Sequence, residues 1–240
     1  MTMLAPKLDE RLSPSIFAQI DQFHLAVIQD LVVSKADDDR FTHDHSIGVA
    51  GFSAALAAEI GLDPLTIGLA AAAGLLHDVG KVMVPREILF KNGRLTAEEF
   101  EHMKAHPSHG NAILEACPID DRVRSAALMH HERIDGSGYP FGAFGEDIPL
   151  LARLVSVADI VDALSADRPY RSGLPEAAVR QELLKLRGGA LDPRLVDCAL
   201  WLMDGRYHDS RWSAYAKPQT QPSPHVGYGR HGLSFVAAGE

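Results

Sequence analysis

Apolar residues recur along most of this chain with the spacing of one buried helical face. The first such segment has Ser13 and Pro14 as its N-cap and N1 residues, and its apolar positions continue to Leu31. A second helix is predicted from about Ser46 to Ile60. No segment shows a convincing strand pattern, so the sequence predicts an all-α fold.

Later segments extend this helical pattern. A helix is predicted after Asp63-Pro64 and is expected to end at Gly80; because it is apolar nearly all round, it should be central. The capping box formed by Thr96 and Glu99 predicts another helix start. Further helices are predicted near 108–116, 121–133, 150–165, 175–187 and 193–204.

One long loop interrupts the pattern between Ile134 and Pro149, and its residues 135–145 read DGSGYPFGAFG. Loops of this length beside ligand-bearing helices are commonly functional, although such a loop can also simply connect two helices. After about Tyr207 the chain is rich in Pro, Gly, Ser and Gln, which is typical of disorder. The expected organisation is a helix or linker over 1–40, one helical domain over 41–205 and a disordered tail over 206–240.

Composition narrows the class of protein. The 240 residues are 46% hydrophobic and 23% charged, which suits one globular domain with tails. We expect no membrane span and no secretion signal, and therefore a cytoplasmic protein. Cys117 and Cys198 lie far apart and are interpreted as small buried hydrophobes. The net charge of −9 excludes broad nucleic-acid binding but allows a small anionic ligand if positive charge is placed locally.

The histidines carry the candidate chemistry, because eight of the twelve fall within fewer than ninety residues. These eight are His43, His45, His77, His102, His106, His109, His130 and His131. Buried imidazoles each need a partner, so convergence of several on one core favours a metal site. Asp78 follows His77 directly and could bridge two cations. A lone His-Asp pair is more often a polar cap, so the clustering is what supports the metal interpretation.

The motifs, taken in order, resemble the HD-GYP family, a branch of the HD-domain metal-dependent phosphohydrolases. The resemblance covers roughly Phe41 to Val196. It rests on His45-Ser46 with Val49-Ala50, Leu76-His77-Asp78-Val79-Gly80-Lys81, Gly93-Arg94-Leu95-Thr96, Met103-Lys104-Ala105-His106-Pro107, His130-His131-Glu132, Asp135-Gly136-Ser137-Gly138-Tyr139-Pro140, Ala158-Asp159, Asp162-Ala163-Leu164 and Arg168-Pro169-Tyr170-Arg171.

The resemblance implies a helical HD bundle with the HD-GYP extension, and hydrolysis of cyclic di-GMP to linear pGpG, GMP or both. It implies seven metal ligands: His45, His77, Asp78, His106, His130, His131 and Asp159. One ion would take His45, His77, Asp78 and Asp159. The other would take Asp78, His106, His130 and His131, with Asp78 bridging.

Two divalent ions are expected, with iron or manganese favoured by the mixed imidazole and carboxylate ligands and by the resemblance. Phe41 stands where some members have a Glu that binds a third metal, so a trinuclear centre is not expected. Two cations about 3.5 to 4 Å apart can activate a hydroxide for in-line attack at phosphorus. Besides Asp78, the catalytic assignment is Lys81, one helical turn later, at the scissile phosphate.

For substrate binding, the resemblance suggests Asp162, Arg168, Arg171 and Tyr139, and the loop that contains Tyr139 could also dock diguanylate cyclase domains. His102 and His109 lie one turn either side of His106 and are interpreted as surface or supporting residues. Two other functions stay open. One is hydrolysis of another cyclic dinucleotide or nucleotide, and the other is a receptor or scaffold with little turnover. A homodimer is compatible with either.

Overall fold

The computed structural model describes residues 40–166 and 172–204. Within these ranges the chain forms helices, no strand is present, and two isolated bridges, Asp135 with Phe144 and Arg187 with Leu191, are the only sheet-like pairings. The all-α prediction is confirmed. The helix predicted between Ser13 and Leu31 and the predicted C-terminal tail lie outside the described residues, so the domain boundaries stay a prediction.

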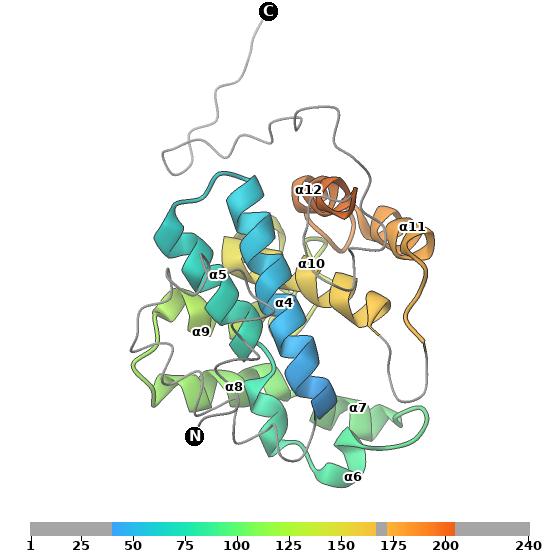
Figure 1. Ribbon diagram of the computed structural model, residues 1–240. Coiled ribbons are helices and arrows are strands. Elements are labelled where there is room, and N and C mark those ends of the chain that lie inside the picture. The colour runs from blue at the N-terminus through green and yellow to red at the C-terminus, as the bar shows by residue number, and fades with distance from the viewer. Residues whose placement is uncertain (1–39, 167–171, 205–240) are drawn as a thin grey trace, which may run out of the picture.

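Three helices form the centre of the bundle. α4 (Arg40–Glu59) lies alongside α5 (Pro64–Leu76), and α10 (Leu150–Ser165) packs against both (Figure 1). The N-cap Asp63 accepts a hydrogen bond from the Thr66 backbone and starts α5. Every residue of α5 from 68 to 76 is buried, as its all-round apolar pattern predicts. This central helix delivers His77 and Asp78 to the middle of the bundle.

The same central segment has enough apolar length to be compared with a membrane span. Pro64–Met83 meets the criteria for a membrane span by length and composition, although no membrane span was expected from the sequence. However, 72% of its apolar window is buried by the rest of the domain. A core helix passes the same test, so this is only a weak indication of a membrane segment.

The remaining elements surround this centre. They are η1 (Val79–Met83), α6 (Arg86–Leu89), α7 (Ala97–Lys104), α8 (His106–Glu115), α9 (Asp121–Met129), η2 (Gly145–Asp147), α11 (Glu176–Leu186) and α12 (Pro193–Met203). In Figure 1, α11 and α12 lie at one end of the bundle, and α6 and α7 lie at the other. The capping box at Thr96 is present and begins α7, as predicted.

Four helix boundaries differ from the sequence predictions at the positions that carry ligand-type side chains. α4 begins at Arg40 instead of Ser46, and α5 ends at Leu76 with a separate 3-10 turn after it. α8 already begins at His106, because Pro107 fits the first turn of a helix. α9 ends at Met129 instead of continuing to 133. Polar side chains turned towards the core interrupt the apolar pattern at each of these places.

Gly80 lets η1 lie directly against the start of α8. A Cβ atom at Gly80 would stand 2.0 Å from the His106 carbonyl oxygen and 2.3 Å from the Gly110 backbone nitrogen. Both atoms belong to the backbone, so no side-chain rotation could relieve the overlap. The approach brings Asp78 and His106, which are far apart in sequence, to the same point of the core.

We predict that Gly80→Ala will lower the free energy of unfolding by about 1 to 3 kcal/mol, because the backbones of η1 and α8 must separate. The matched control is Gly110→Ala, whose added Cβ would meet its nearest atom, the Gly80 nitrogen, at 3.4 Å. That change should be tolerated better. Chemical denaturation of both variants measures the difference, and equal stabilities would contradict the role assigned to Gly80.

Candidate metal centre

Three ligand-type side chains converge where α4 meets the end of α5. His45 lies on α4, and His77 and Asp78 directly follow the last residue of α5. Their exposed fractions are 6%, 1% and 2%. One donor atom from each lies within 4.8 Å of the others. We call these three residues the His45 group.

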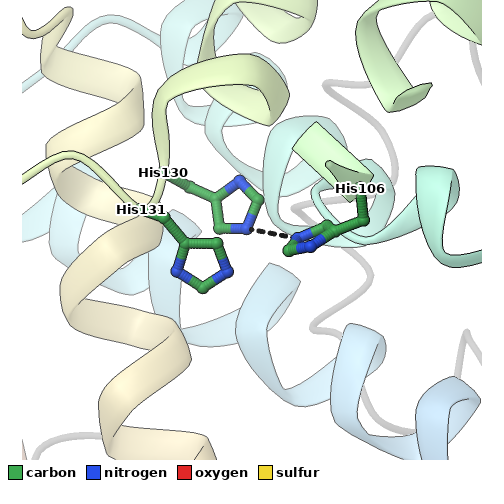
Figure 2. Close-up of side chains that lie close together, drawn as sticks. All are labelled: His106, His130 and His131. Carbon is green, nitrogen blue, oxygen red and sulfur yellow. Dashed lines mark hydrogen bonds between the residues drawn. The ribbon is translucent and has the colours of Figure 1, made fainter. Parts of the chain in front are cut away.

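A second set of imidazoles lies beside the first. His106 is the first residue of α8, while His130 and His131 directly follow α9. One nitrogen from each ring lies within 4.8 Å of the others. Figure 2 shows the two neighbouring rings of His130 and His131 with the ring of His106 opposite them. We call these three residues the His106 group.

Asp78 connects the two groups through its two oxygens. Its Oδ1 lies 3.2 Å from Nε2 of His106. Its Oδ2 lies 3.3 Å from Nε2 of His77 and 4.0 Å from Nε2 of His45. One carboxylate therefore presents a different oxygen to each group, which is the arrangement that a bridging ligand requires.

Backbone carbonyls fix the orientation of three of the imidazoles. The Nδ1 contacts are His77 to Gly74 O at 2.7 Å, His106 to Met103 O at 2.8 Å and His130 to Ala127 O at 2.8 Å. A carbonyl oxygen can only accept, so Nδ1 is the nitrogen that carries the proton in each neutral ring. The Nε2 lone pairs consequently point towards the centre, as in metal sites where the second ring nitrogen is held by an acceptor.

These lone pairs are placed as a cation would require. Nε2 of His106 and Nε2 of His130 lie 3.3 Å apart, and a proton between them would require one ring to be doubly protonated (Figure 2). Nε2 of His77 is buried without a hydrogen-bond partner among the described residues. Facing lone pairs and an unsatisfied buried nitrogen are costly unless a positive charge lies between them. The residues present therefore fit metal binding.

Two aspartates of α10 complete the surroundings of His45. Asp159 Oδ1 lies 3.2 Å from His45 Nε2, on the side that faces His77 and Asp78. Asp162 Oδ2 lies 2.7 Å from His45 Nδ1 on the opposite side of the ring, and Asp162 is only 3% exposed. Asp159 is thus brought to the predicted ligands, whereas Asp162 supports a ligand from behind. A direct contact of Asp162 with substrate stays a prediction.

Electrostatics keep most of the donors in the state that binds a cation. Burial would raise the pKa of Asp78, but His77 and Lys81 outweigh it and hold that pKa well below its usual range. The pKa of Asp159 is also lowered despite burial, chiefly by its hydrogen bond with His45. Burial lowers the pKa of His130 strongly and that of His131 to about 3, so both rings stay neutral.

His45 differs from the other imidazoles in its protonation. Burial alone would lower its pKa, but the hydrogen bonds to Asp159 and Asp162 outweigh burial and raise the pKa to about 9. At neutral pH a cation that binds Nε2 of His45 must therefore displace a proton. Asp159, which accepts the hydrogen bond from this Nε2–H group, also supplies negative charge that attracts the cation.

The other predicted site residues lie at different distances from this centre. Lys81 Nζ contacts Asp78 Oδ2 at 2.5 Å. The ring of Tyr139 stacks on His131 with the centroids 4.7 Å apart. His102 is exposed and His109 half-buried, and neither joins the two groups. Arg168 and Arg171 lie outside the described residues, so their substrate contacts stay predictions.

Glu132 is a residue to which the sequence analysis gave no role. It is 2% exposed and accepts hydrogen bonds from the backbone nitrogens of Phe141, at 2.7 Å, and Ala143, at 3.0 Å. A buried glutamate needs such partners, since burial of an unpaired carboxylate is costly. Its position directly after two predicted ligands was the available signal.

Comparisons with known proteins identify the family of this chain. The family described as "HD domain" matches residues 27–195. The chain is 40% identical over 173 residues to a cyclic di-GMP phosphodiesterase of Pseudomonas aeruginosa, which covers 72% of this chain and 41% of that protein. It is 37% identical over 163 residues to a 3'3'-cGAMP-specific phosphodiesterase of Vibrio cholerae, with 67% and 31% covered. The chain therefore spans less than half the length of these two curated relatives.

Solved structures share the fold as well. An HDG"Y"P protein from Bdellovibrio bacteriovorus superposes with a TM-score of 0.58 and 28% identity, over 68% of this chain and 52% of that one. The family match covers more than half of this chain and includes all seven predicted ligands. The chain belongs to the HD domain family, and its resemblance to the HD-GYP branch is confirmed.

Proposed function

We propose that this domain is a metal-dependent phosphodiesterase that hydrolyses cyclic di-GMP to linear pGpG, GMP or both. The observation that carries the proposal is the placement of Asp78 between two sets of Nε2 atoms, each set suited to one cation. The names of the relatives support the choice of a cyclic dinucleotide as substrate. The predicted location in the cytoplasm is consistent with such a signal molecule.

The metal centre has two ions in this proposal, iron or manganese. When bound, such a pair lowers the pKa of a water molecule and offsets the charge of the phosphodiester. His45, His77, Asp78 and Asp159 would hold one ion. Asp78 would also join the His106 group to hold the other. Neutral imidazoles and ionised carboxylates are the donors that these metals accept, and His45 becomes such a donor by losing its proton.

Lys81 is assigned to the reacting phosphate. Its side chain is 26% exposed and contacts the buried Asp78. An ammonium group has three N–H donors, so Nζ can keep one on Asp78 and direct another to a phosphate oxygen. Such a donor stabilises negative charge that develops on the leaving oxygen and can transfer a proton to it.

Two further parts of the proposal concern recognition. Arg168 and Arg171 would offer planar guanidinium groups to the phosphates or guanine edges, with Tyr139 and Asp162 near the same substrate. The loop that contains Tyr139 carries exposed Phe141 and Phe144 side chains, which a diguanylate cyclase domain or a second copy of the chain could contact.

A second candidate substrate is 3'3'-cGAMP, favoured by the 37% identity to a phosphodiesterase specific for it. The two cyclic dinucleotides share the phosphodiester ring and differ in one base. The metal centre therefore cannot discriminate between them. Discrimination must come from groups that contact the base edges.

We predict that Asp78→Asn will lose at least about a hundredfold in metal affinity and turn over no cyclic di-GMP, because an uncharged amide bridges two cations poorly. The control is Asp121→Asn, an exposed aspartate at the opposite end of α9 from His130. Metal analysis and a hydrolysis assay on both variants test this. Retention of metal and turnover in Asp78→Asn would refute the bridging role.

We also predict that Lys81→Met will lower kcat by about 10² to 10³, the usual cost of removing one transition-state donor. The metal content should stay close to that of the wild type, since no predicted ligand is changed. Metal analysis beside steady-state kinetics separates the two effects. An unchanged kcat would show that Lys81 only neutralises Asp78.

A substrate panel distinguishes the candidate functions. After anaerobic loading with iron or manganese, we expect cyclic di-GMP to be hydrolysed with a higher kcat/KM than 3'3'-cGAMP, and nucleoside triphosphates not at all. The reverse order for the two dinucleotides would select the second candidate. Binding of cyclic di-GMP without any turnover would identify a receptor or scaffold instead.

A further inference from the structure

His131 is held differently from the other four imidazoles of the centre. In each of those four rings Nδ1 is hydrogen-bonded to a carbonyl or carboxylate oxygen. Among the described residues, the contacts of the His131 ring are with other rings, and its stacked partner is Tyr139, with 4.7 Å between centroids and 28° between planes. The orientation of His131 consequently depends on an aromatic face instead of a hydrogen bond.

The backbone around Tyr139 is fitted closely to the residues that follow the His130-His131 pair. The Tyr139 nitrogen donates a hydrogen bond to the His131 carbonyl oxygen at 3.3 Å. A Cβ atom at Gly138 would stand 2.4 Å from both the Arg133 nitrogen and the Glu132 Cα, so only glycine allows this approach. The loop is therefore packed directly against the segment that carries the ligands.

Glu132 holds the part of the same loop that follows Tyr139. Its two carboxylate oxygens accept from the backbone nitrogens of Phe141 and Ala143, and its burial excludes water from both bonds. The Gly145 nitrogen closes the loop by donating to the Ile134 carbonyl oxygen at 3.0 Å. Tyr139 thus lies between two fixed points, the His131 carbonyl and the Glu132 carboxylate.

We propose that Tyr139 is a positioning residue for the metal centre: its ring fixes the His131 imidazole by stacking, and Glu132 holds the loop that presents this ring. This inference rests on the proposed metal function and adds a role for two residues that contact no ion in it. The stack occupies one face of His131 and leaves the ring edge, where both nitrogens lie, available to a cation. A ligand that is held before the cation arrives loses less rotational freedom on binding.

The test is stepwise titration of the metal-depleted domain with Mn²⁺, followed by calorimetry, and with Co²⁺, followed by its absorption spectrum. For Tyr139→Leu we expect one of the two binding events to weaken by about 10- to 100-fold, the usual effect of losing a supporting residue, while the other is unchanged. Tyr139→Phe keeps the ring and should titrate like the wild type. The cobalt spectrum of Tyr139→Leu should change for the weakened event only.

Phe141→Leu is the matched control, because it removes an aromatic ring that is 66% exposed from the same loop and keeps the backbone bond to Glu132. It should titrate like the wild type. Glu132→Gln replaces one of the two acceptor oxygens by a donor and should weaken the same event as Tyr139→Leu. Thermal unfolding of each variant confirms that the domain is folded.

The outcomes separate this inference from the proposed function. Wild-type titration behaviour in Tyr139→Leu, or an equal loss in Tyr139→Phe, would overturn the stacking role and leave the proposed activity untouched. A wild-type domain that binds ions but hydrolyses no cyclic dinucleotide would overturn the activity and leave the titration result valid. A wild-type domain that binds no ion would refute both.

Discussion

The sharing of one buried carboxylate by two sets of imidazoles is the constraint on which the rest of this structure depends. Asp78 is 2% exposed, and one of its oxygens lies near Nε2 of His77 while the other lies near Nε2 of His106. A buried carboxylate without positive partners would be costly. Its surroundings must therefore bring α4, α5, α8 and α9 to a single point, and the closeness of these helices follows from that requirement.

Small residues make this convergence sterically possible. At Gly74 a Cβ atom would stand 2.8 Å from the Ala50 backbone, so α4 and α5 approach each other more closely than larger side chains would permit. The carbonyl of Gly74 in turn accepts from His77. Gly80 allows the same close approach of backbones between η1 and α8. Packing and ligand orientation thus use the same residues, which explains why the helices break where the ligands begin.

The sequence predicted those parts of the molecule that follow local rules. The capping box at Thr96 predicted the start of α7. The apolar pattern of α5 predicted its burial. The division of the ligands into two groups followed from the resemblance, and the structure brings both groups together. Local rules failed at α4, because the sequence prediction started the helix at Ser46 and missed six further helical residues, 40–45. His45 is polar and buried at once, and apolar periodicity does not detect such a residue.

The contacts that Glu132 and Asp162 make could not be predicted from the sequence, for a related reason. Each acts through a partner distant in sequence, nine and eleven residues away for Glu132 and 117 for Asp162. A pattern read along the chain registers a side chain's type and spacing but not the partner it meets after folding. The sequence shows that a carboxyl group is present at each of these two positions. Only the folded structure shows which groups each carboxylate contacts.

Because the chain has a net negative charge, the proposed metal ions have a second role besides their chemistry. With a net charge of −9, the protein as a whole repels an anionic dinucleotide. Within the site the cationic side chains are already paired with carboxylates, Lys81 with Asp78 and the protonated His45 with Asp159 and Asp162. Two divalent cations would make the site positive. In the proposed function, substrate binding is therefore conditional on metal occupancy, because the same ions that supply the chemistry also supply the attraction.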